Sequence, residues 1–146
     1  MTFDPSDLLA AAVRARASAY APYSKFFVGA ALVTPDGAVF TGANVENASY
    51  GLSMCAERVA IYHALSQGVR AFDAVAVTGP NGVLTMPCGA CRQVLSEFGP
   101  HMQVVYPDAD VLKVTPLSLL LPGAFNGAVL AGAAAGGAGP PARGVR

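Results

Sequence analysis

The stretch FDAVAVTGPNGVLTMPCGACRQVLSEFGPHMQVVY, residues 72–106, decides the expected fold. Its apolar run over residues 72–79 predicts a strand, and Asn81-Gly82 predicts a turn after that strand. A helix is predicted over residues 88–98, where Gly99-Pro100 ends it, and another strand over residues 103–106. Strands that alternate with helices of this length are typical of an α/β sheet covered by helices.

The sequence on both sides continues this alternation. Further helices are predicted over residues 4–20 and 55–67, and further strands over residues 28–33, 38–42 and 111–115. Small residues in the strand 28–33 indicate close packing of helices on its face. We expect one domain over residues 1–126, followed by a flexible tail over residues 127–146, which are nearly all Gly, Ala and Pro.

Composition indicates an assembly of subunits and disfavours a polynucleotide partner. Only 12% of the 146 residues are charged, whereas 53% are hydrophobic. A typical soluble domain has about 25% charged residues, so we expect large subunit interfaces. The formal net charge is zero and the basic residues are scattered, which disfavours DNA or RNA as a partner.

The cysteines and the chain start favour the cytoplasm as location. The start lacks the basic region of a secretory signal, and no uninterrupted apolar run is long enough to span a membrane. Three cysteines at unequal spacing are unlike a disulfide framework. In a reducing compartment such a set indicates metal binding or catalysis.

Two short motifs contain the chemistry: Met54-Cys-Ala-Glu57 and Met86-Pro-Cys-Gly-Ala-Cys-Arg-Gln93. The thiolates of Cys55, Cys88 and Cys91 suit Zn²⁺, which favours sulfur ligands. Cys55 and Cys88 each begin a predicted helix, where the helix dipole favours negative groups. Three thiolates on Zn²⁺ leave one net negative charge, which Arg58 and Arg92 could offset.

An open position on the metal would distinguish a catalytic zinc from a structural one. His63 and His101 are the remaining strong candidates for a fourth ligand, but standard helix rise puts them about 12 Å and about 15 Å from the cysteines that precede them. Three protein ligands plus water is the catalytic pattern. Glu57 is then the natural proton carrier, provided that Cys55 lies in the very first turn. Alternatively, Glu57 only complements the helix dipole and the cysteines form a structural site.

With these motifs the chain resembles the small homotetrameric cytidine deaminases. The likeness runs from about Ala19 to Phe125. It rests on Pro22-Tyr-Ser-Lys-Phe26, Val28-Gly-Ala-Ala-Leu32, Gly42-Ala-Asn-Val-Glu-Asn-Ala-Ser-Tyr50, Cys55-Ala-Glu-Arg58, Pro87-Cys-Gly-Ala-Cys-Arg-Gln93 and Leu121-Pro-Gly-Ala-Phe125.

The resemblance implies a three-layer α/β/α fold with a mixed five-stranded sheet and one zinc per subunit. It assigns roles to twelve residues: Cys55, Cys88 and Cys91 as zinc ligands, Glu57 as proton shuttle, Phe26 against the pyrimidine, Asn44 and Glu46 on the ribose hydroxyls, the backbone of Ala56 on the base edge, Arg58 as donor to the ligand sulfurs, and Ala48, Tyr50 and Phe125 in a neighbouring subunit's pocket. Phe27 departs from the common pattern, so either Phe26 or Phe27 could stack on the base.

Several of these assignments have simpler alternatives. Phe26 could belong to the core, because aromatic side chains bury large areas. Asn44 and Asn47 could be turn formers, and Phe125 could pack on its own subunit.

The expected function is hydrolytic deamination of free cytidine and deoxycytidine in pyrimidine salvage. One alternative is a deaminase of another aminopyrimidine nucleoside, such as blasticidin S. Others are a deaminase that edits RNA or DNA, which the lack of a basic groove disfavours, and a non-catalytic zinc-stabilised binding module.

Overall fold

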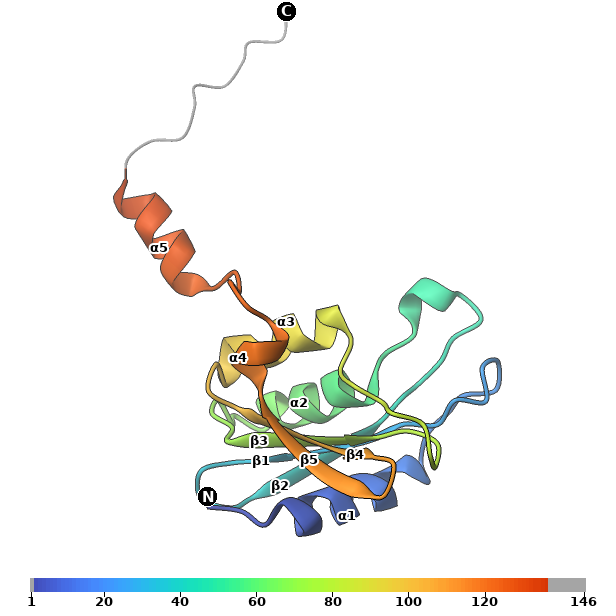
Figure 1. Cartoon of the computed structure of the whole chain (residues 1–146). Helices are drawn as coiled ribbons and strands as arrows, with labels where there is room; N and C mark the ends of the chain where they lie inside the picture. The colour runs from blue at the N-terminus through green and yellow to red at the C-terminus, as the bar shows by residue number, and fades with distance from the viewer. Residues whose placement is uncertain (1, 137–146) are drawn as a thin grey trace, which may run out of the picture.

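The chain forms a mixed five-stranded sheet in the computed structural model, which describes residues 2–136 (Figure 1). The strands are β1 (Gly29–Val33), β2 (Val39–Ala43), β3 (Ala74–Thr78), β4 (Gln103–Asp108) and β5 (Val111–Pro116). Their order across the sheet is β2-β1-β3-β4-β5, with β3 and β4 parallel and the other neighbouring pairs antiparallel. The expected fold class is confirmed.

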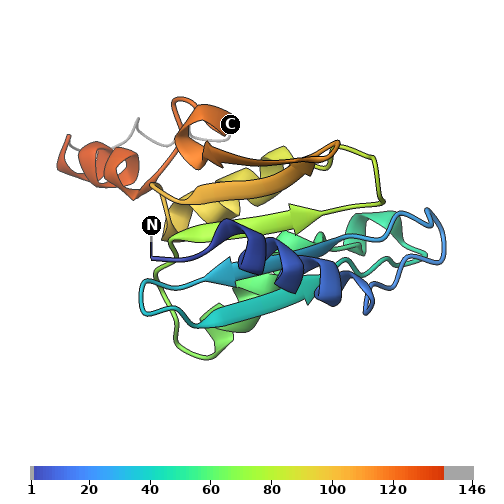
Figure 2. The same cartoon turned by 60° about the horizontal axis from the view of Figure 1, so that its bottom comes forward.

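Helices cover both faces of the sheet and make three layers. Helix α1 (Pro5–Arg16) lies on one face, whereas α2 (Ala56–Ser66) and α3 (Gly89–Phe98) lie on the other (Figures 1 and 2). The Asp4 side chain caps α1 by accepting hydrogen bonds from the backbone N–H groups of Ser6 and Asp7.

Alternation along the central strands divides the core into two clusters. In β3, Ala74 and Ala76 face α1, whereas Val75 and Val77 belong to the larger cluster under α2 and α3. The small side chains toward α1 let that helix approach the sheet closely. At Gly29 a Cβ atom would lie 2.0 Å from the carbonyl oxygen of Ala12 in α1, so the predicted close packing on β1 is confirmed.

Three short elements were not predicted from the sequence. They are a 3₁₀ turn over Tyr50–Leu52, helix α4 (Leu117–Leu120) and helix α5 (Gly127–Ala135). The 3₁₀ turn and α4 span only three and four residues, too few to produce a periodic pattern.

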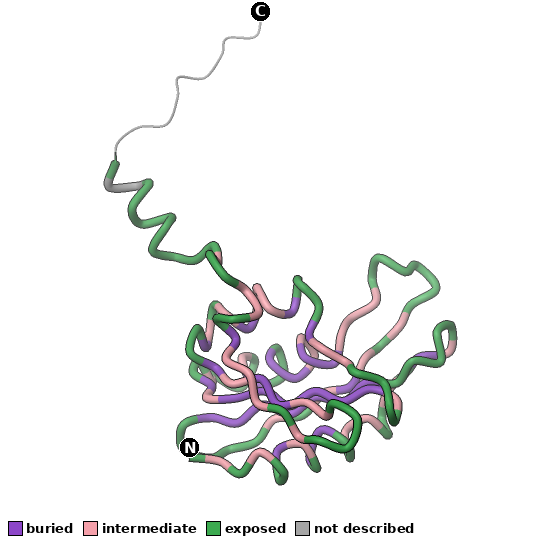
Figure 3. Tube along the Cα trace, viewed as in Figure 1, coloured by how far each residue is buried: buried purple, intermediate pink, exposed green. Residues whose placement is uncertain are grey.

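Residues 127–135 of the expected flexible tail form helix α5. Asn126 caps this helix with its side chain, and most of the helix is alanine, which has the highest helix propensity. The described side chains of α5 are exposed (Figure 3), so local propensity rather than core packing forms this helix. The rest of the expected tail, residues 137–146, lies outside the described residues, and the domain boundary at residue 126 stays a prediction.

Within residues 2–136, no helix combines the length and the apolar character that crossing a bilayer requires.

Candidate active site and zinc centre

The three cysteines meet where the N-termini of α2 and α3 come together. Cys55 is the N-cap residue of α2, Cys88 is the N-cap residue of α3, and Cys91 is buried in the first turn of α3. All three Sγ atoms lie within 4.8 Å of one another, and those of Cys55 and Cys88 are 3.8 Å apart. Tetrahedral zinc with Zn–S bonds of about 2.3 Å requires sulfurs about 3.8 Å apart, so the thiols fit this ion.

The thiols sit in a positive environment. Two helix N-termini point at them, and the Arg58 Nη2 atom donates to the Cys55 sulfur at 3.4 Å. Hydrogen bonds from Cys91 and Arg58 lower the pKa of the Cys55 thiol to about 5, against the opposing effect of burial. The pKa of the Cys91 thiol is raised by the hydrogen bond between Cys91 and Cys55 and by burial. The cluster therefore already favours an anionic sulfur for a cation to bind.

Arg92 and His63 have partners outside this cluster. Arg92, which could offset the charge of the site, donates to the carbonyl oxygens of Pro87 at 2.7 Å and Leu120 at 2.9 Å. His63 packs edge-on against Phe40 and lies 3.4 Å from the carbonyl oxygen of Thr41. Within residues 2–136, neither His63 nor His101 belongs to the group that could hold a metal.

Glu57 lies in the first turn of α2, two residues after Cys55. As the second residue of α2 it follows an N-cap cysteine, which is the placement that lets positions 55 and 57 share one site. Its side chain is only 4% exposed. Burial raises the pKa of Glu57 to about 7, and the negative charge of Cys55 acts in the same direction. Such a carboxyl group can both accept and donate a proton near neutral pH.

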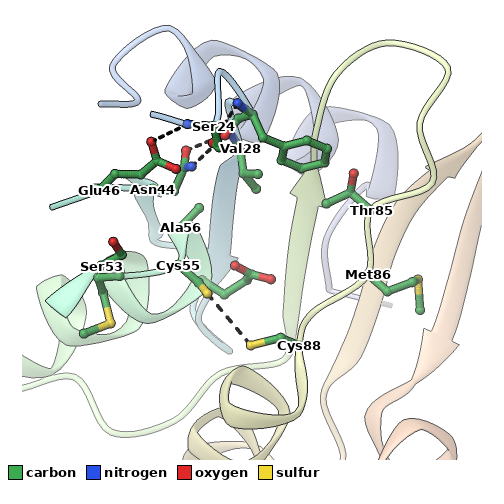
Figure 4. Close-up of a pocket in the computed structure, with 13 residues that line it drawn as sticks. Ser24, Val28, Asn44, Glu46, Ser53, Cys55, Ala56, Thr85, Met86 and Cys88 are labelled. Carbon is green, nitrogen blue, oxygen red and sulfur yellow. Dashed lines mark hydrogen bonds between the residues drawn. The ribbon is translucent and has the colours of Figure 1, made fainter. Parts of the chain in front are cut away.

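A cavity of about 300 Å³ opens above Glu57 and the cysteines (Figure 4). Seven residues singled out in the sequence line it: Phe26, Asn44, Glu46, Cys55, Ala56, Glu57 and Cys88. Ala56 is the first residue of α2, so its backbone N–H has no helical acceptor and is free for a ligand. Phe27 does not line the cavity, which selects Phe26 as the ring that faces it.

Residues 4–107 match the family described as the cytidine and deoxycytidylate deaminase zinc-binding region. The chain belongs to this deaminase family. It is 50% identical over 126 residues to a cytidine deaminase of Halalkalibacterium halodurans, covering 84% of this chain and 95% of that protein. A crystal structure of cytidine deaminase from Burkholderia pseudomallei is 53% identical, with a TM-score of 0.79 over 84% of this chain and 100% of that one. Blasticidin-S deaminase of Bacillus cereus is more distant, at 32% identity over 107 residues, 68% of this chain and 76% of that protein.

In this deaminase, Asn44 and Glu46 also hold the loop that presents Phe26. The Asn44 side chain accepts from the Val28 N–H at 2.8 Å and donates to the Phe26 carbonyl oxygen at 2.8 Å. One Glu46 carboxylate oxygen accepts from the backbone N–H groups of Tyr23 and Ser24 at 3.0 and 3.1 Å (Figure 4). Asn44 therefore holds this loop as well as lining the cavity.

Sequence reasoning missed six lining residues of the deaminase: Ser24, Val28, Ser53, Met54, Thr85 and Met86. Ser24, Val28, Met54 and Met86 lie within the quoted motifs and Ser53 directly precedes one, so membership in or adjacency to a motif is the signal that could have found them. Thr85 lies in no quoted motif. It reaches the cavity because the loop before Cys88 crosses the mouth on the side opposite Asn44 (Figure 4).

Ala48, Tyr50 and Phe125 do not line the cavity of their own subunit. Tyr50 is 75% exposed and its ring centroid lies 6.0 Å from that of Tyr23. Phe125 is 55% exposed, so about half of its surface is free for a partner. These three residues of the deaminase are available to another molecule.

Proposed function

We propose that this deaminase converts free cytidine and deoxycytidine to uridine and deoxyuridine, releasing ammonia, as a step of pyrimidine salvage. The observation that supports this most is a buried Glu57 beside three sulfurs, at the inner end of a cavity with polar groups at its other end. The relatives at 50% and 53% identity are named cytidine deaminases.

Glu57 performs the proton transfers of the proposed reaction. When bound by Cys55, Cys88 and Cys91, zinc supplies a Lewis acid that makes a water molecule easier to deprotonate at neutral pH. The Glu57 carboxylate takes a proton from that water and delivers it to N3 of the pyrimidine, which makes C4 electrophilic. The hydroxyl oxygen adds to C4, and Glu57 then carries the remaining proton of that hydroxyl group to the amino nitrogen. The C4–N bond breaks to release ammonia and leaves a carbonyl group at C4.

Other residues bind the nucleoside in this proposal. The Phe26 ring packs against the pyrimidine, the Ala56 N–H binds the base edge, and Asn44 and Glu46 bind the ribose hydroxyls. Arg58 tempers the negative charge of the three ligand sulfurs through its contact with Cys55.

The charges of the cavity favour a nucleoside over a nucleotide. Its thirteen lining residues include two carboxylates, Glu46 and Glu57, and no basic side chain. Hydrogen bonds with Ser24 and Tyr23 lower the pKa of Glu46, so it stays negatively charged at neutral pH. A phosphate group would meet repulsion and no cationic partner.

We infer a cytoplasmic homotetramer in which neighbouring subunits complete each other's sites. Exposed apolar side chains near the cavity and beyond it support an extensive interface: Tyr50, Leu52, Leu119, Phe125, Val129 and Leu130. Ala48, Tyr50 and Phe125 reach into the pocket of a neighbour. Free thiols at the metal site suit a reducing compartment.

Two other functions remain as outcomes of the test. Blasticidin S deamination would use the same zinc and Glu57 chemistry and differ only in substrate. A non-catalytic zinc module would bind the metal and turn over no substrate.

The test is ultraviolet absorbance of the zinc-loaded protein with cytidine, deoxycytidine, cytosine, CMP and blasticidin S. We expect rapid conversion of both nucleosides, none of CMP, and loss of activity on chelation that zinc restores. Turnover of blasticidin S alone would overturn the substrate but keep the chemistry. No turnover of any substrate by zinc-loaded protein would refute the proposal.

A further inference from the structure

Two neighbouring side chains of α3 bind the segment that follows α4. Gln93 donates from Nε2 to the Phe125 carbonyl oxygen at 2.8 Å, and Arg92 donates from Nη1 to the Leu120 carbonyl oxygen at 2.9 Å. Both residues directly follow Cys91. The helix that supplies two zinc-site cysteines therefore also holds the segment 120–125 at its two ends.

Side-chain packing holds the segment 120–125 less firmly than these two hydrogen bonds do. A cavity of about 350 Å³ lies against it, bounded by Leu121, Gly123, Ala124 and Asn126 on one side and by Ser96 and Pro100 at the end of α3 on the other. The chain leaves α4 beside α3 and runs out to the exposed helix α5 (Figure 1). Because none of residues 121–126 is buried, the hydrogen bond from Gln93 has a large share in setting the position of residue 125.

We propose that Gln93 is a positioning residue for the deamination reaction. It fixes the backbone at Phe125, so that the exposed ring of Phe125 points outward in the orientation needed to enter a neighbouring subunit's pocket. This inference rests on the proposed sharing of sites between subunits. Gln93 itself lines no part of its own subunit's cavity, so it acts only through Phe125.

The test is a double-mutant cycle between Gln93 and Phe125, with steady-state kinetics on cytidine. Gln93→Ala and the nearly isosteric Gln93→Glu both remove the donor. Each should raise KM by about 3- to 10-fold, the effect of losing one hydrogen bond, with a smaller change in kcat and with full zinc content. Glu97→Ala is the matched control, because Glu97 is exposed one turn further along the same face of α3. It should behave as wild type.

In a Phe125→Ala background, Gln93→Ala should add no further loss, because the ring through which Gln93 acts is gone. If Phe125→Ala impairs the enzyme but Gln93→Ala does not, or if the two effects multiply, the positioning role is refuted. If Phe125→Ala itself has no effect, the proposed sharing of sites between subunits is refuted. This result differs from the results that refute only the positioning role of Gln93.

Discussion

At the residue scale, the site depends on two helix N-termini rather than on one contiguous motif. Cys55 and Glu57 lie on the same site only because residue 55 precedes the first turn of α2. In the middle of a helix, positions two apart point in different directions. Because Cys55 is the N-cap residue, its sulfur and the Glu57 carboxyl group can lie side by side, one as a zinc ligand and the other as a proton carrier.

Replacing Glu57 by Gln should abolish proton transfer while keeping the shape of the site. Acid–base groups contribute about 10²- to 10⁴-fold, and Glu57 serves as both acid and base, so kcat should fall by several orders of magnitude. Zinc content, measured by atomic absorption, should stay at one per subunit. Activity near that of wild type would show that another group moves the proton.

Replacing Cys88 by Ala should remove the metal and with it the activity. Two remaining sulfurs hold zinc weakly, and the negative charge near Cys55 loses its counter-ion. We expect zinc loss during dialysis and a lower midpoint of thermal unfolding than in the wild type. Chelation of the wild-type protein should reproduce both effects reversibly. A Cys88→Ala variant that keeps stoichiometric zinc would contradict this ligand assignment.

At the element scale, two glycines let helices approach opposite faces of the sheet. A Cβ atom at Gly29 would clash with α1, and one at Gly42 would lie 2.4 Å from the backbone nitrogen of Ala60 in α2. The clashing atoms are backbone, so no side-chain rotation can relieve them. Gly42 sets the distance between the sheet and α2, and through α2 the position of Cys55 and Glu57.

Gly42→Ala should therefore destabilise the fold by about 1–3 kcal/mol or more, the usual cost of overpacking. Urea unfolding followed by circular dichroism would measure the change. Gly127→Ala is the matched control, because nothing lies within 4 Å of the added methyl group and residue 127 is helical. Equal stabilities of the two variants would show that α2 can move away at little cost.

At the scale of the whole molecule, the exposed aromatic side chains of one subunit would complete the cavity of another. Such sharing predicts complementation between two impaired variants, Glu57→Ala and Phe125→Ala. In a mixed assembly, a site with Glu57 from one subunit and Phe125 from its neighbour has every proposed residue.

Co-expression of these two variants with different affinity tags should yield mixed tetramers with a kcat/KM per intact site close to that of wild type. Light scattering would establish the tetramer. Mixed assemblies no more active than the average of the two variants would contradict the shared site. A monomer with full activity would contradict both the assembly and the role of Phe125.

The sequence by itself determined the alternation of strands and helices, the zinc chemistry and the family, because these depend on local periodicity and on short motifs with fixed spacing. Its Ala-rich and Gly-rich end did not reveal α5, since small side chains that bury little apolar surface indicate only that no core forms there, and alanine still favours a helix.

Only the tertiary structure decided which residues line the cavity and how the site is held. Thr85 lies on it and Phe27 does not, and Asn44 and Glu46 clamp the loop of Phe26. Arg92 and Gln93 bind the segment that ends at Phe125. These contacts join residues 16 or more positions apart. Periodicity and motif spacing describe only local sequence, so they do not predict which distant residues the fold brings together.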